Sequence, residues 1–345
     1  MKIRGLPASV CGETLYSWSF RCAQRKYQCL DAAWLRVSQI YNSSDSRFEA
    51  PVREEDFHEF FLGWNIPEYI VWGVFNCQKL FLLDSDFRSC YCPHCLLSDV
   101  KEYGLPCWRM SWCDVRYVYC HEHKCLLSSL NSTWALQNKA WLAFSDAVNY
   151  GIPRGQFETP NATHINLLNQ FNRLISRVQR AFMQVQSSGL RSASCEGRPD
   201  DELDLGCVYI LVFSLLLRLR TTRVPAGVAR YLLSDDCVTI AHGDFTYDEC
   251  LRMGVARSNP NQRMVALLLL GWIVGLFNES EVKVISRVVE AARFVWPRSL
   301  KDLGRMAGDA VGGDSVIKVF EGKYRGPDAF GSNLILFVAG LKQSS

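Results

Sequence analysis

The sequence lacks any apolar run long enough to cross a membrane. Its two longest apolar stretches, residues 207–217 and 264–277, are interrupted by a serine and by two glycines. Both are shorter than the roughly 18 residues expected of a membrane-spanning helix. After Met1-Lys2-Ile3-Arg4, small and polar residues come before any long apolar stretch, so no secretory signal is readable. We therefore expect buried core helices, no membrane association and a cytoplasmic location.

The familiar catalytic motifs are also missing. The sequence holds no glycine-rich phosphate loop, no H-E-x-x-H and no G-x-S-x-G, and His58, His164 and His242 are isolated from one another. His121-Glu122-His123 invites comparison with the H-x-E of zinc deaminases, but their P-C-x-x-C should follow downstream, and here the C-x-x-C turn comes before it. We therefore expect a protein that is not an enzyme.

The chain carries little excess charge of either sign, because 38 Lys and Arg residues nearly balance 35 Asp and Glu residues and the formal net charge is only +3. Nucleic-acid binding must then depend on local clusters. Arg173, Arg177 and Arg180 lie opposite the apolar stripe of a helix predicted over residues 163–186, where they could contact phosphates or form an ordinary solvated face. A second basic stretch could bind RNA or an acidic protein surface; it comprises Arg218, Arg220, Arg223 and Arg230.

Cysteine, by contrast, is abundant. Of the 15 cysteines, seven lie between Cys90 and Cys125, together with three of the six histidines. An odd number of cysteines without a readable export signal favours reduced thiols over a disulfide framework. The clustering indicates a metal site.

Two short turns supply the expected ligands. Cys92-Pro-His-Cys95 is a C-x-x-C turn and Cys120-His-Glu-His123 is a C-x-x-H turn, with 24 residues between them. Three thiolates and one imidazole suit a closed tetrahedral zinc site with a structural role. The alternative is a set of buried thiols packed as small apolar groups. The nearby residues that could replace a proposed ligand are Cys90, His94, His121 and Cys125.

The rest of the chain is predicted to be helical. Helical patterns cover residues 13–33, 56–62, 68–81, 163–186 and 278–292, and a polar stretch over 187–201 resembles a linker. The expected fold is mainly α, with helical N- and C-terminal domains flanking a small zinc-knuckle module. The predicted boundaries are 1–86 for the N-terminal domain, 87–130 for the module, 131–195 for an amphipathic segment and 196–345 for the C-terminal domain.

The knuckle segment closely resembles the TniQ family. Its members show a C-P-x-C turn, an aromatic-Arg-x-x-Trp stretch and a C-x-x-H followed by leucines, matched here by residues 92–95, 108–112 and 120–127. The opening helix of the family, E-S-L-x-S-W, is similar to Glu13-Thr-Leu-Tyr-Ser-Trp18, and its W-P segment to Trp296-Pro297. Many longer members carry a second pair of knuckles after the C-x-x-H, whereas residues 126–141 contain no cysteine. One zinc site is therefore expected.

The resemblance implies a non-enzymatic adaptor for target selection in bacterial DNA transposition. Such a protein, as a homodimer, links a Cascade-like CRISPR effector with its guide RNA to an AAA+ regulator of the TnsC type. The alternative is a TnsD-like protein that itself binds a DNA attachment site. Trp108, Trp112 and Tyr117 could stack on bases, although aromatic residues beside a small zinc site usually form its core.

Overall fold

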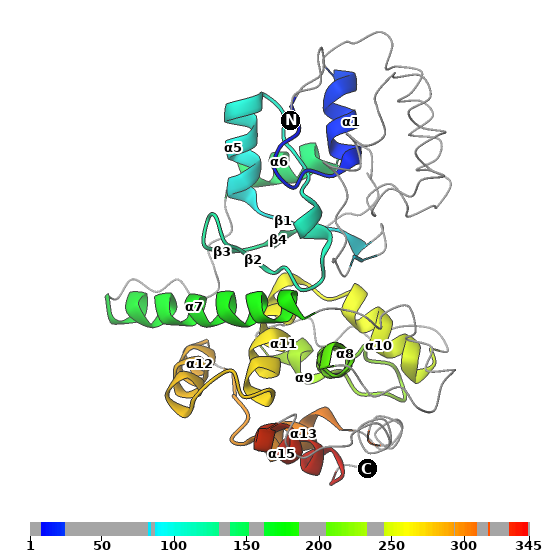
Figure 1. Ribbon diagram of the computed structural model, residues 1–345, viewed down its shortest axis with the longest axis vertical. Coiled ribbons are helices and arrows are strands. Elements are labelled where there is room, and N and C mark those ends of the chain that lie inside the picture. Colours follow the sequence, from blue (N-terminus) through cyan, green and yellow to red (C-terminus); the bar gives the residue numbers. More distant parts are fainter. Residues whose placement is uncertain are drawn as a thin grey trace. The chain divides into compact units, whose positions relative to one another are not determined.

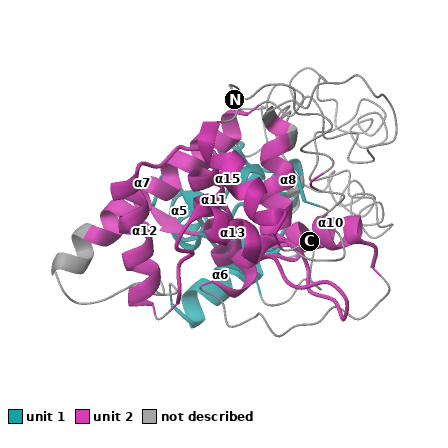
Figure 2. Ribbon diagram, turned by 90° about the horizontal axis from the view of Figure 1, so that it is seen from below, with its two compact units in different colours: residues 1–123, 127–153 teal, residues 124–126, 154–345 magenta. Residues whose placement is uncertain are grey.

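A computed structural model of the protein describes residues 8–24, 82–83, 87–130, 139–151, 162–185, 205–232, 245–292, 294–308, 317 and 331–343. Helices make up most of this part of the chain, which confirms the mainly α prediction (Figure 1). Contacts divide the chain into two compact units, residues 1–123 with 127–153 and residues 124–126 with 154–345 (Figure 2). The finer division into four domains stays a prediction. Within the described ranges, no helix is long and apolar enough to span a membrane.

The first unit combines short helices with very short strands. Its elements are α1 (Leu15–Gln24), β1 (Cys90–Tyr91), α5 (Pro93–Tyr103), the 3-10 helix η4 (Met110–Cys113), β2 (Tyr119–Cys120), β4 (Ser128–Ser129) and α6 (Lys139–Asn149). Strands β1 and β4 pair antiparallel, with Cys90 opposite Ser129 and Tyr91 opposite Ser128. Helix α5 packs against α6.

Tryptophan side chains fill much of the interior of this unit. Trp18, Trp108 and Trp112 are at most 2% exposed, and the last two meet edge to face with ring centroids 5.3 Å apart. Each such side chain removes roughly 150–250 Å² from water. Burial of Trp108 and Trp112 favours their interpretation as core over the alternative that they stack on bases.

The described residues of the second unit lie mostly in helices. They are α7 (Ala162–Gln184), α8 (Leu205–Leu217), α9 (Val228–Tyr231), α10 (Tyr247–Ala256), α11 (Pro260–Ile273), α12 (Glu279–Ala291), α13 (Leu300–Ala307) and α15 (Gly331–Leu341). The unit also includes β3 (Cys125–Leu126). Helix α11 is buried along nearly its whole length and contacts α7, α8, α9 and α15.

Most expected helices in the described ranges are present. The amphipathic helix predicted over 163–186 is α7, whose Phe171, Ile175 and Val178 are buried on its apolar stripe. The two longest apolar runs form α8 and most of α11, as expected for core helices. The helix predicted over 13–33 corresponds in part to α1, which ends at Gln24 within the described residues. The predictions over 56–62, 68–81 and 187–201 lie outside the described residues.

Candidate metal centre

The start of helix α5 positions the C-x-x-C pair. Cys92 is the N-cap residue in an extended conformation, Pro93 occupies the first helical turn and Cys95 follows within that turn. Proline is favoured there because its missing N–H would have no helical partner. Both sulfurs therefore lie near a helix N-terminus, where the dipole favours the thiolate form that binds metals. Both side chains are at most 1% exposed.

The C-x-x-H pair lies on a tight reversal of the chain. Cys120 ends strand β2, and the loop that holds His123 is closed where the Leu127 N–H donates to the Val118 carbonyl at 2.9 Å. Lys124, directly after the histidine, has a positive φ of 51°. Such a conformation is uncommon outside glycine and turns the backbone sharply. The reversal brings His123 back toward the thiols.

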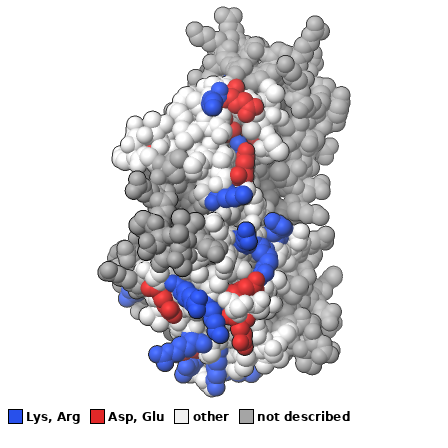
Figure 3. Space-filling model, turned by 90° about the vertical axis from the view of Figure 1, so that its left-hand side faces the viewer, with Lys and Arg blue, Asp and Glu red and all other residues white. Residues whose placement is uncertain are grey.

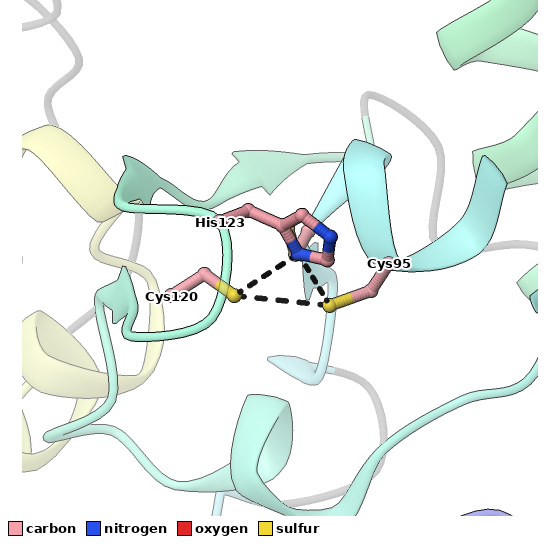
Figure 4. A group of neighbouring side chains, drawn as sticks. Cys95, Cys120 and His123 are labelled. Carbon is pink, nitrogen blue, oxygen red and sulfur yellow. Dashed lines mark hydrogen bonds between the residues drawn. The ribbon is translucent and has the colours of Figure 1, made fainter. Parts of the chain in front are cut away.

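The four predicted ligand atoms converge. The Sγ atoms of Cys95 and Cys120 lie 3.7 Å apart, and His123 Nδ1 lies 3.2 Å from Cys95 Sγ and 3.7 Å from Cys120 Sγ (Figure 4). His123 Nδ1 also lies 3.7 Å from Cys92 Sγ. A tetrahedral zinc ion separates two bound sulfurs by roughly 3.8 Å and a sulfur from a nitrogen by roughly 3.5 Å, given bonds of about 2.3 and 2.0 Å. In the described part of the chain these four residues thus form a group that could hold a metal ion, compatible with zinc.

Crowding of the ligands has an electrostatic consequence. The pKa of the Cys95 thiol is raised because it shares hydrogen bonds with Cys120 and Cys92, and burial adds to the rise. The pKa of Cys120 is raised as well, first through its hydrogen bond with Cys92. Packing three thiolates together is therefore unfavourable unless a cation lies among them. A closed set of three sulfurs and one imidazole leaves no position for substrate, as expected of a structural centre.

Arg109 lies against this cluster and bridges its two halves. One guanidinium nitrogen donates to Asp99 Oδ1 of helix α5 at 2.9 Å, and the other donates to Glu122 Oε2 of the C-x-x-H turn at 3.1 Å. Asp99 is buried and Glu122 is largely exposed. Burial by itself lowers the pKa of Arg109, but Asp99 and Cys95 outweigh it and raise the pKa. The guanidinium is firmly cationic beside the thiols.

The opening helix of the resemblance packs onto the segment between the knuckles. The Thr14 N–H donates to the Trp108 carbonyl at 2.9 Å, and the Trp108 N–H donates to Ser17 Oγ at 2.8 Å. Met110 N–H donates to the Gly12 carbonyl at 2.7 Å. Three motifs that are far apart in the sequence therefore belong to one packed module. Sequence reasoning recognised each motif but missed that they touch.

The alternative ligands lie outside the group of four. The imidazole of His94 stacks on that of His123, with ring centroids 5.4 Å apart, and His121 packs edge-on against Tyr117. Cys90 is buried in strand β1, and Cys125 is half-buried in β3. The ligand choice predicted from spacing is thus the one that the geometry of the described residues favours.

The arginines predicted to contact nucleic acid lie on the exposed face of α7. Arg173, Arg177 and Arg180 are all exposed. Arg177, however, forms a bidentate ion pair with Glu281 of α12 at 2.8 and 2.7 Å and donates to the Leu276 carbonyl at 2.7 Å. On the face in Figure 3, basic side chains lie among acidic ones. Arg177 is thereby engaged within the unit, while its two neighbours face solvent.

The second basic stretch is not a surface patch as a whole. Arg218 is 0% and Arg230 is 8% exposed, and Arg218 donates to the Pro225 carbonyl and to Tyr247 Oη at 3.0 and 2.9 Å. Arg230 donates to Gln262 Oε1 and to the Gly254 carbonyl, both at 3.4 Å. The hypothesis that these two contact RNA or an acidic protein is therefore wrong, because both guanidinium groups are buried and hydrogen-bonded inside the unit. Arg220 and Arg223 remain exposed.

Comparison of the whole chain with known proteins finds no matching protein family, no significantly similar curated protein and no significantly similar solved structure. Function is therefore inferred from this chain's own residues and from the motifs that resemble TniQ.

Proposed function

We propose that the chain is a non-enzymatic target-selection adaptor of bacterial DNA transposition, similar to TniQ. In this role it links a Cascade-like CRISPR effector and its guide RNA to an AAA+ regulator of the TnsC type, and it acts as a homodimer. The ion held by Cys92, Cys95, Cys120 and His123 is zinc, which staples a small module between helical domains.

The observation that carries the proposal is the packing of the TniQ-like motifs on one another. The C-x-x-C helix, the Trp108-Arg109-x-x-Trp112 stretch and the opening helix share hydrogen bonds and ion pairs in one unit. A chance match of separate short motifs gives no reason for such contacts. Because these motifs pack into one structural module, they support a common evolutionary origin with TniQ proteins. A common origin in turn supports the adaptor role.

Zinc is favoured over other metals by the ligands themselves. Three sulfurs and one imidazole in a roughly tetrahedral arrangement suit zinc, whereas calcium and magnesium prefer oxygen ligands. Because the set is closed, the ion supplies stability and shape and no reaction chemistry.

Co-purification tests the adaptor role. The full-length chain, tagged, is incubated with the guide-RNA complex and, separately, with the AAA+ regulator from its own genetic neighbourhood. We expect both to be retained, and we expect Cys95→Ser to weaken retention because the module loses its metal. Cys125→Ser, the same substitution at a cysteine outside the group of four, serves as the matched control. Retention of neither partner by the metal-loaded protein would contradict the proposal.

The exposure of Arg173 and Arg180 favours one alternative, a TnsD-like protein that binds a DNA attachment site itself. Mobility-shift assays at several salt concentrations separate the two functions. If the arginines contact phosphates, the double variant Arg173→Ala/Arg180→Ala reduces the salt dependence of binding by about 0.9 per lost contact. Absence of binding by the unmodified protein even at low ionic strength would remove this alternative.

A further inference from the structure

Arg109 touches two structures at once, one through its side chain and one through its backbone. The side chain reaches Asp99, four residues beyond Cys95 on α5, and Glu122, which lies between Cys120 and His123. Glu122 Oε2 is itself 3.8 Å from Cys95 Sγ. Since each acidic partner belongs to a different ligand pair, the guanidinium fixes the distance between the two pairs. Its cation also lies beside a thiolate-rich centre.

The backbone of the same residue faces the N-terminal segment. Arg109 forms an isolated antiparallel bridge with Glu13, and the flanking residues Trp108 and Met110 hydrogen-bond to residues 12–17. The Glu13 carboxylate is in turn held by Arg21 at 2.6 and 2.8 Å and by Ser17 Oγ at 2.9 Å. Residues 108–110 are thus the platform on which the N-terminal segment rests.

We propose that Arg109 is a positioning residue that couples metal retention to the docking of residues 12–18. Metal binding draws the two ligand pairs together. The guanidinium bridge between them holds the backbone extended at Arg109, just before η4 begins at Met110, which is the shape that the N-terminal segment requires. Outer-shell groups of this kind commonly change metal affinity by about 10–100-fold. Because coupling free energies are reciprocal, weakening the N-terminal contacts must also weaken metal retention.

The reciprocal effect sharpens the first experiment. Ser17 contacts none of the ligands, yet its Oγ accepts the Trp108 N–H at 2.8 Å. Ser17→Ala leaves that buried N–H without its partner. We expect Ser17→Ala to accelerate zinc release to a chromogenic chelator several-fold. We expect Arg109→Ala to accelerate it by about 10–100-fold.

The second experiment measures docking directly. Hydrogen–deuterium exchange of the full-length zinc-loaded protein is compared with the chelator-treated protein over residues 12–18. We expect the amides of Thr14 and Trp18, which donate to Trp108 and Thr14 carbonyls, to exchange faster once the metal is removed. Zinc-loaded Arg109→Ala should show the same loss of protection, although its metal is present.

Two further variants keep the test decisive. Glu122→Gln removes only the exposed arm of the bridge and therefore folds even if Arg109→Ala does not; it should speed zinc release by a smaller factor. Gly304→Ala destabilises the other unit, where an added Cβ would meet the Phe337 carbonyl, and should leave zinc release unchanged. If zinc release depended only on general stability, both variants would release zinc faster than the unmodified protein.

Two results would overturn the coupling. One is unchanged exchange over residues 12–18 after complete metal removal. The other is zinc release from Ser17→Ala and Glu122→Gln at the rate of the unmodified protein, with the metal content of all samples verified beforehand.

Discussion

Single residues in the candidate metal centre differ in what they can contribute, because four offer ligand atoms to a metal ion and their neighbours offer only position. The sulfurs of Cys95 and Cys120 lie 3.7 Å apart in buried residues, whereas Cys125 is half-buried and lies outside the group. A serine in place of a ligand cysteine loses the thiolate that binds the ion. The loss should therefore depend on position and not on cysteine count.

Cys95→Ser is expected to lower zinc content from one ion per chain to well below it. Cys125→Ser, an equal change in composition, should retain the ion. Elemental analysis of the purified proteins by mass spectrometry measures both. Retention of zinc by the first variant combined with its loss from the second would mean that the ligand assignment is wrong.

The Arg177–Glu281 pair predicts a specific dependence on pH. Hydrogen bonds from Arg177 hold the pKa of the Glu281 carboxyl below its ordinary value. A lowered folded-state pKa stabilises the protein above the unfolded value of about 4.3 and loses that effect as pH falls through the folded value. The pair is partly exposed, so the contribution is at most about 1 kcal/mol.

Glu281→Gln tests this prediction with the helix cap kept intact. Glutamine can still accept from the Asn278 N–H, as the carboxylate does at 3.0 Å, but it cannot form the ion pair. The difference in unfolding free energy between the two proteins, measured by urea titration, should be present at pH 7 and vanish toward pH 3. A difference that is constant over this range would contradict the assigned cause.

At the scale of elements, close backbone approach decides where helices can pack. Helices α13 and α15 contact each other through Gly304 and Gly340, and a Cβ on either would lie 2.1 Å from a carbonyl oxygen of the other helix. Backbone atoms cannot give way as the end of a side chain can. The two glycines therefore set the distance between these helices.

Gly304→Ala and Gly340→Ala are each expected to destabilise the protein by about 1–3 kcal/mol through overpacking. Lys301→Ala changes an exposed position on α13, the helix that holds Gly304. It should alter the free energy of unfolding by no more than about 0.5 kcal/mol. Thermal unfolding followed by circular dichroism compares them. Equal melting temperatures for all three variants would show that the helices can separate without cost.

At the scale of the whole molecule, the two compact units have separate interiors. The four candidate metal ligands all belong to the first unit, while α8 and α11 form the buried centre of the second. Because a structural metal contributes folding free energy to the segment that binds it, its removal should act mainly on the first unit.

Chelation is thus expected to increase amide exchange over residues 87–130 and to leave α11 protected. Exchange mass spectrometry on the full-length protein with and without chelator distinguishes the units. A simultaneous and equal loss of protection in both would indicate that they fold as one cooperative block.

Local patterns in the sequence were sufficient for elements whose determinants lie close together in the chain. The apolar stripe of α7 and the Asn278–Glu281 capping box of α12 involve residues three or four apart, so periodicity predicted the first and the helix-start signal predicted the second. The ligand pairs were equally readable, because a two-residue gap is enough to direct two side chains at one ion. The burial of Arg218 and Arg230 could not be predicted from the sequence. A charged side chain indicates a surface position unless carbonyl groups from distant parts of the chain replace its water.

The sequence by itself determined the helical character of the described residues, the group of four that could hold a metal ion and the motifs that resemble TniQ. Only the tertiary structure decided that these motifs touch, that Arg109 joins the two ligand pairs to the N-terminal segment, and that Arg177 is already paired. The physical reason is distance along the chain: the Ser17 to Trp108 hydrogen bond spans 91 residues and the Arg177 to Glu281 pair spans 104. Contacts of that range leave no periodic trace in the residues between them, and only folding brings the partners together.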